Sequence, residues 1–229
     1  FWRQSFSYLD PDLGWHLKTG EQIVKTMELP RINEINYPLA GEKWIDHEWL
    51  SNVLIYETYS HLGYIVLTGI FALIFVATFF LLNRWLKKTI LKEKWHWGLI
   101  MALEIAGALA IAPHIGIRIQ MVTTFFLLVT LIILEGYRRQ PHWIKLLWLI
   151  PWLYLWACLH AGFLAGILTI VLFWIINIGQ RIIKWRGLSS EFILSQKQIT
   201  AGLIVSLAAI SSTLVTPYFL ELYSFLFGY

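Results

Sequence analysis

The chain is 229 residues long, 58% hydrophobic and only 14% charged, whereas charged residues make up about 25% of a typical soluble domain. This composition argues against an ordinary soluble globular protein and is typical of a membrane protein. The net charge of +4 is unevenly divided, because residues 1–63 hold nine acidic and five basic residues, whereas 64–229 hold five acidic and thirteen basic ones. Basic residues confined to short loops between apolar runs indicate membrane topology and not nucleic-acid binding.

The first predicted helix follows an acidic, aromatic segment. Asp10 suits the N-cap position, Pro11 the first helical position and Asp12 the first turn, where it faces the positive end of the helix dipole. Apolar residues then recur at helical spacing: Leu13, Leu17, Val24 and Met27. The opposite side is charged, so the pattern predicts an amphipathic helix over about 11–27 that is too polar to span and lies at the membrane interface.

A loop and a second interfacial helix complete the N-terminal segment. Residues 28–46 show no periodicity and contain two prolines and a glycine, which predicts a loop. A second amphipathic helix is expected over about 47–62, with Asp46 as its cap. Residues 1–63 are therefore predicted to form one segment outside the membrane. Because the chain opens on Phe1 and not on methionine, we expect it to be a fragment whose first span lies upstream.

The remaining residues, 64–229, read as a transmembrane domain. Six segments are predicted to cross the membrane: about 64–83, 97–112, 121–134, 146–159, 163–179 and 199–216. A 20-residue helix covers the ~30 Å hydrocarbon core of a bilayer. The uncharged run over 146–180 would be about 52 Å long as one helix, so we divide it at His160. The predicted fold class is an all-α, polytopic integral membrane protein.

The basic residues of the connecting loops predict the orientation. Lys and Arg number five in 84–96, one in 113–120, three in 135–145, none in 160–162 and four in 180–198. This alternation is the positive-inside pattern, so the basic loops are predicted to be cytoplasmic. Residues 1–63, the loop around Arg118 and the turn at His160 would then share the non-cytoplasmic face of the cell membrane. The residues best suited to chemistry gather on one side.

Asp10 and Asp12 are the first candidates for chemistry. Two carboxylates one residue apart can share a divalent cation such as Mg²⁺ or Mn²⁺, or one can act as a general base beside the other. The same two residues also suit a plain helix cap with an acid in the first turn. Spacing alone leaves both interpretations open.

Further candidates for substrate binding are His16, His47, Glu48 and Arg118. His47 and Glu48 equally suit an ordinary helix start, and His16 is not interpretable alone. An arginine in a short non-cytoplasmic loop suits phosphate or pyrophosphate, and equally an interfacial side chain that snorkels. Glu104 falls inside a predicted span, where an ionisable group is either functional or hydrogen-bonded to a neighbouring helix.

These motifs resemble a known superfamily. The similarity lies in Asp10-Pro11-Asp12 with the residues up to Gly20, in Trp44-Ile45-Asp46-His47-Glu48-Trp49, and in residues 118–120, 159–164 and 216–218. An acidic motif before two interfacial helices and many spans resembles the GT-C superfamily of polytopic glycosyltransferases. Within it, the chain looks like a poorly characterised prokaryotic group, with a more distant similarity to the catalytic subunit of oligosaccharyltransferase.

The resemblance implies an enzyme of the cell envelope. It would transfer a sugar from a polyprenyl-phosphate donor to a glycan, lipid or protein acceptor, with Asp10 or Asp12 as base or metal ligand. Arg118 would hold the donor phosphate. The implied partners are membrane lipids and this donor, with no nucleic acid. The alternatives are a transporter or flippase that uses Glu104, and a non-catalytic fragment of a larger membrane protein.

Overall fold

The computed structural model describes residues 11–35, 37–89, 96–111, 116–185 and 193–228. Within these residues the regular structure is helical, apart from one isolated antiparallel bridge between Ile32 and Lys43, which confirms the all-α prediction at this level. The chain divides into two compact units, Phe1–Phe125 and Phe126–Tyr229. The predicted division after residue 63, between an external segment and a membrane domain, stays a prediction.

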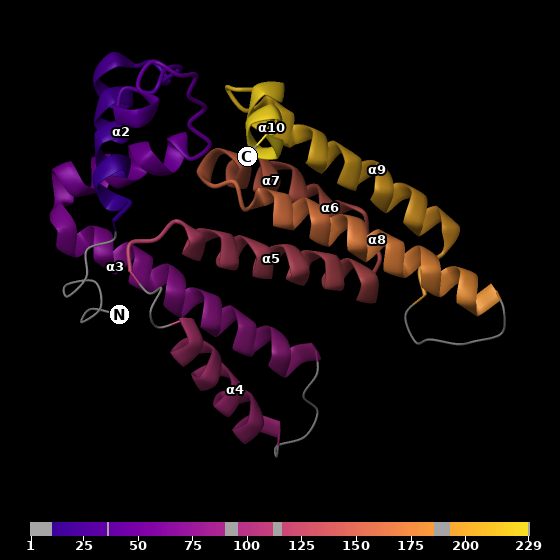
Figure 1. The fold of residues 1–229 in the computed structure, drawn as a ribbon. Coiled ribbons are helices and arrows are strands. Elements are labelled where there is room, and N and C mark those ends of the chain that lie inside the picture. Colours follow the sequence, from indigo (N-terminus) through magenta and orange to yellow (C-terminus); the bar gives the residue numbers. More distant parts are fainter. Residues whose placement is uncertain (1–10, 36, 90–95, 112–115, 186–192, 229) are drawn as a thin grey trace. The chain divides into compact units, whose positions relative to one another are not determined.

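The first unit is built on a long, bent helix. Its elements are α2 (Leu13–Thr26), the single turn η1 (Tyr37–Leu39), α3 (Trp49–Thr89), α4 (His96–Ile111) and the start of α5 (Gln120–Arg139). Helix α3 bends at Gly63. The backbone angles there are φ 78° and ψ 174°, a conformation that residues other than glycine rarely adopt. The bend in Figure 1 therefore lies between the predicted interfacial helix and the first predicted span.

The start of α2 corrects one prediction. The helix begins at Leu13 with Asp12 at the N-cap, and the Asp12 side chain makes no capping hydrogen bond. The expected position of Asp12 in the first turn was therefore wrong, while Asp10 lies outside the described residues. The main-chain oxygen of Asp12 accepts the N–H of His16 at 3.1 Å, so the first helical bond starts from Asp12.

The buried face of α2 also differs from the prediction. Its buried residues are Leu13, His16, Thr19, Gly20 and Ile23. Leu17 and Val24 are only half-buried, and Met27 is 86% exposed. The reason is that α2 packs on α3 also through small and polar residues, while Leu17 packs against the hydrophobic cluster that contains Leu13 and Ile55.

Four described helices are long and apolar enough to cross a membrane: Trp49–Thr89, Gln120–Arg139, Phe163–Ile183 and Gln196–Val215. Two shorter apolar helices, Trp97–Ala110 and Ile144–Leu159, coincide with the other two predicted spans. The chain thus has the helices of a membrane protein.

The second unit is a helical bundle. Besides α5 it contains α6 (Ile144–Leu147), α7 (Leu149–Leu159), α8 (Phe163–Trp185), α9 (Gln196–Ser212), η3 (Thr213–Val215) and α10 (Leu220–Phe227). The long apolar run is divided at His160, where the backbone is extended. The Nδ1 atom of His160 accepts the N–H of Gly162 at 2.9 Å, which is a structural role in the turn before α8.

Neutral hydrogen bonds and close contacts hold the second unit together. The indole N–H of Trp174 donates to the Ser206 hydroxyl at 2.9 Å, between α8 and α9, and the Tyr137 hydroxyl donates to the Gln198 carbonyl at 2.6 Å. At Gly202, an added Cβ would lie 2.2 Å from Trp174 Cη2. The bundle therefore closes through small residues under large aromatic rings, as membrane helices commonly do.

Candidate functional site

The site lies where α2 packs on the first part of α3. Gly20 permits this contact, because a Cβ there would lie 2.2 Å from the main-chain oxygen of Asn52 and 2.6 Å from Tyr56 Cβ. His16 stands one turn before Gly20, and Asn52 one turn before Tyr56. The close approach of the two backbones therefore brings the side chains of His16 and Asn52 together.

A relay of three buried polar side chains results. Asn52 Oδ1 lies 2.6 Å from His16 Nδ1, and Asn52 Nδ2 donates to both carboxylate oxygens of Asp46 at 2.9 Å. Asp46 and Asn52 are fully buried, and His16 is 4% exposed. Buried polar groups of this kind need partners, and each of the three finds one within the relay.

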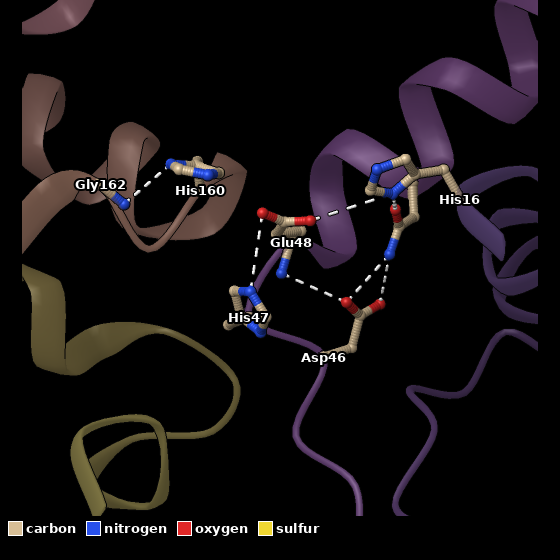
Figure 2. Close-up of polar contacts among 7 residues, drawn as sticks. His16, Asp46, His47, Glu48, His160 and Gly162 are labelled. Carbon is tan, nitrogen blue, oxygen red and sulfur yellow. Dashed lines mark hydrogen bonds and ion pairs between the residues drawn. The ribbon is translucent and has the colours of Figure 1, made fainter. Parts of the chain in front are cut away.

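Glu48 lies between two histidines. One carboxyl oxygen is 3.9 Å from His16 Nδ1 and the other is 3.6 Å from His47 Nε2, and Figure 2 shows the carboxyl group between the two rings. Its backbone N–H donates to Asp46 Oδ1 at 3.2 Å. The sequence predicted a helix start at residue 47; the helix begins instead at Trp49, and the residues before it carry the cluster.

Burial sets the protonation of this cluster. It raises the pKa of Glu48 to about 8, and the nearby carboxylates of Asp46 and Asp12 raise it further in the same direction. Burial likewise raises the pKa of Asp46 to about 6, against hydrogen bonds from Asn52 and the Glu48 backbone. The pKa of His47 is lowered by burial. Burial therefore favours the protonated form of both acids, and more strongly that of Glu48.

Two aromatic rings stand beside the relay. The ring of Trp15 contacts that of His16, with centroids 4.1 Å apart, and meets Trp44 edge-on at 6.2 Å. Trp15 and Trp44 are half-buried. Their position gives His16 an aromatic neighbour, Trp15, that is partly exposed.

Arg118 is carried by the same unit. Its neighbours Ile117 and Ile119 are 3% and 2% exposed and belong to one hydrophobic cluster with Leu13, Ile55, Leu67 and Phe71. Leu13 directly follows Asp12. The loop that bears Arg118 is therefore anchored to the core that holds the start of α2, although the two lie about a hundred residues apart in the chain.

The predicted metal pair is only half described. Asp12 is exposed at the start of α2, and Asp10 lies outside the described residues. Among the residues that the structure describes, no group of three His, Cys, Asp or Glu side chains is placed to hold a metal ion. The role of Asp10 and Asp12 as ligands of Mg²⁺ or Mn²⁺ therefore stays a prediction.

Sequence reasoning missed Asn52 and assigned Asp46 only a capping role. Asn52 was readable as a lone amide inside the apolar helix that follows Trp49. Glu104, in contrast, has the structural role that the sequence offered: its carboxylate accepts hydrogen bonds from Asn83 of α3 at 3.1 and 3.2 Å.

Comparison of the chain with protein-family models, curated proteins and solved structures found no match.

Proposed function

We propose that the chain is a GT-C-type membrane glycosyltransferase with six spans, which takes its sugar from a polyprenyl-phosphate donor. Residues 1–63 lie on the non-cytoplasmic face of the cell membrane. The observation that carries this proposal is the buried acid–histidine cluster of His16, Asp46 and Glu48. The loop that contains Arg118 packs, through Ile117 and Ile119, on the same hydrophobic core as the start of α2. Buried ionisable groups are costly and gather at functional sites.

The chemistry follows from where such a donor is held. A polyprenyl phosphate stays in the membrane plane, so its sugar is presented at headgroup level, where interfacial helices can carry acids. The acceptor oxygen forms a bond to the anomeric carbon while the bond from that carbon to the phosphate oxygen breaks. The phosphate leaves with the electron pair, and its negative charge is stabilised by Arg118. The acceptor's proton passes to an aspartate of the α2 start, Asp10 or Asp12.

No step in this scheme passes through a metal. A transport function would rest instead on an ionisable group within the spans. Glu104 is the acid there that the sequence singled out, and its carboxylate is engaged by Asn83 between two helices. This pairing favours a structural role for Glu104, so transport ranks below glycosyl transfer.

The test is sugar transfer by membranes that contain the full chain. A panel of radiolabelled polyprenyl-phosphate hexoses is offered to wild type and to Asp10→Asn, Asp12→Asn and Glu42→Gln. Glu42 is an exposed acid of the same segment outside the cluster and serves as the matched control. We expect transfer by wild type and by Glu42→Gln, with a loss of at least tenfold in one aspartate variant.

Two results would contradict the proposal. If both aspartate variants transfer sugar as wild type does, the aspartates are not the base. If no donor of the panel is used and Glu104→Gln abolishes solute uptake by vesicles, the protein is a transporter. Absence of both activities would favour a non-catalytic membrane component.

A further inference from the structure

The C-terminal end of α3 carries a cluster of exposed cations directly after a long apolar run. Residues 64–83 contain no charged side chain, and as a helix this run is about 30 Å long, the thickness of the hydrocarbon core of a bilayer. Arg84, Lys87 and Lys88 follow, and all three side chains are exposed. The first cation therefore comes where a helix that spans the membrane leaves the hydrocarbon and reaches the headgroups.

These cations continue an apolar stripe on the outward side of α3. Exposed side chains recur there at intervals of three or four residues: Leu73, Val76, Phe80, Arg84 and Lys88. Residues at this spacing share one side of a helix. The buried residues Leu67, Phe71 and Thr78 lie on the opposite side. The outer stripe of α3, which consists of Leu73, Val76 and Phe80, therefore leads directly to Arg84 and Lys88.

The positive charge at this end is not balanced by acids of the chain. Between Glu57 and Glu104 the described residues include no Asp or Glu, and the carboxylate of Glu104 is hydrogen-bonded by Asn83. Even with Glu93, the sequence over 84–96 holds five basic residues against one acidic residue. Cations one helical turn apart repel each other, so an anion from outside the chain would stabilise this end of α3.

We propose that Arg84 and Lys88 bind the phosphate of an anionic phospholipid whose acyl chain lies along the outer stripe of α3. Arg84 follows Phe80 by one helical turn, about 6 Å along the axis, so the apolar surface and the cations come in the order of an acyl chain and its headgroup. Guanidinium and ammonium groups donate hydrogen bonds to phosphate oxygens. The apolar half of this surface favours a lipid over a free anion. The inference does not depend on glycosyl transfer.

Lys87 has a different neighbour. Its ammonium group lies 3.9 Å from the centroid of the Trp97 ring, at the start of α4, and α4 runs back beside α3 (Figure 1). Tryptophan is enriched at the headgroup level of membrane proteins, which agrees with the depth inferred for Arg84. Because Lys87 is engaged by the aromatic ring, the phosphate is assigned to Arg84 and Lys88.

The first experiment measures lipid binding by native mass spectrometry of the full chain in detergent. Dioleoyl phosphatidylglycerol is compared with dioleoyl phosphatidylcholine, which has the same phosphate but adds a choline cation. We expect wild type to bind phosphatidylglycerol more tightly. In the double variant Arg84→Gln/Lys88→Gln, Kd for phosphatidylglycerol should rise about tenfold, while Kd for phosphatidylcholine changes little. Glycerol phosphate, the headgroup without acyl chains, should not displace the lipid at equal concentration.

The matched control is Arg31→Gln/Lys43→Gln, which removes the same two charges from exposed positions of the loop between α2 and α3 and should bind as wild type does. An equal loss in both double variants would overturn the proposal, because binding would then follow net charge and not this site. Equal affinity of wild type for the two lipids would also overturn it, even if Arg84→Gln/Lys88→Gln fails to fold. Displacement by glycerol phosphate would show that the site takes a free anion.

The second experiment tests the depth of the stripe and of the cations. The single cysteine, Cys158, is replaced by serine, and a nitroxide label is attached at Phe80→Cys or at Lys88→Cys in vesicles that contain phosphatidylglycerol. We expect the label at position 80 to be accessible to oxygen and shielded from a water-soluble nickel complex, and the label at position 88 to be accessible to both. Access of the nickel complex to both labels would overturn the proposal, whatever the outcome of the sugar-transfer assay.

Discussion

The two units bury polar groups in different ways. In the second unit, helices are joined by hydrogen bonds between neutral groups, Trp174 to Ser206 and Tyr137 to Gln198, and no carboxyl group is buried among the residues of that unit that the structure describes. The first unit buries carboxyl groups and histidines together at the α2–α3 contact, where the pKa of Glu48 is raised to about 8. A well-packed apolar contact would be at least as stable as such a cluster. The difference indicates that the buried polar groups of the second unit serve helix packing. The buried acids and histidines of the first unit are better explained by a chemical function.

The largest effect that separates the two units is expected at Gly20. Alanine there would place Cβ 2.2 Å from the Asn52 main-chain oxygen, and backbone cannot move aside as a side chain can. Gly20→Ala should therefore destabilise the protein by about 3 kcal/mol and displace His16 from Asn52. The measurement is the midpoint of thermal unfolding in detergent together with the NMR spectrum of ¹⁵N-labelled histidine side chains.

Gly202 supplies the comparison from the second unit. Its Cβ would also meet an atom at 2.2 Å, the side-chain Cη2 of Trp174. Gly202→Ala should lower stability while the His16 signals stay as in wild type. A Gly20→Ala protein with the wild-type melting midpoint and spectrum would show that the α2–α3 contact is not as close as described.

The next effect is a pH dependence that belongs to the first unit. Glu48 faces His16, His47, Asp46 and Asp12. Its pKa is raised from 4.5 to about 8 on folding, so between these values the folded state binds more protons than the unfolded one. Stability therefore falls as pH rises through this window. From pH 6.5 to 8 the loss should be about 1–2 kcal/mol, and it should be absent in Glu48→Gln.

The pH window is chosen with the neighbouring groups in mind. The pKa of Asp46 is raised to about 6. The stability that its protonation contributes is therefore lost, as pH rises, mainly below about pH 6.5. The lowered pKa of His47 has the opposite sign: the unfolded state binds more protons below 6.5, so stability rises with pH there. The contribution of Glu48 is the difference between wild type and Glu48→Gln in melting midpoints at pH 6.5, 7.2 and 8, because His47 and Asp46 are present in both proteins. A slope that persists in Glu48→Gln would assign it to another group.

A smaller effect is expected from a neutral bond of the second unit. Ser206→Ala removes the acceptor of the Trp174 indole N–H, and both residues are buried. Hydrogen bonds between membrane helices contribute on average about 0.6 kcal/mol, so the melting midpoint should fall slightly. The His16 spectrum and the pH slope should not change. A change in either would mean that the cluster depends on the packing of α8 and α9.

The sequence predicted the features that local rules control. Helical class follows from composition, the interruption at Gly63 lies at the boundary between the two predicted helices, and the turn at His160 follows from the length of the apolar run. It could not predict the buried face of α2, because that face is chosen by a partner helix about 35 residues away and includes Thr19 and Gly20. Apolar periodicity favoured Met27, which is exposed.

The same limit applies to the site. Rules that use the local sequence treat Asp46 as a helix cap. They cannot show that Asn52 contacts both Asp46 and His16, because these residues lie apart along the chain. Pairing requires the close approach at Gly20, which is a tertiary feature. The acidic and histidine residues of the cluster were identifiable from sequence, but their partners were not. The roles of Asp10 and Asp12 as base or metal ligand stay predictions.

The smallest effect is expected at Thr19, and it tests whether every polar group at the α2–α3 contact belongs to the cluster. Thr19 is 1% exposed and its hydroxyl has no hydrogen-bond partner among the described residues. Replacing a buried, unpaired hydroxyl by a methyl group of similar shape removes a desolvation penalty. Thr19→Val should therefore leave the free energy of unfolding unchanged or raise it by no more than about 0.5 kcal/mol, as judged from the midpoint of thermal unfolding. Because Gly20 and His16 flank it on the same face, a loss of stability would mean that the polar cluster extends along α2 to Thr19.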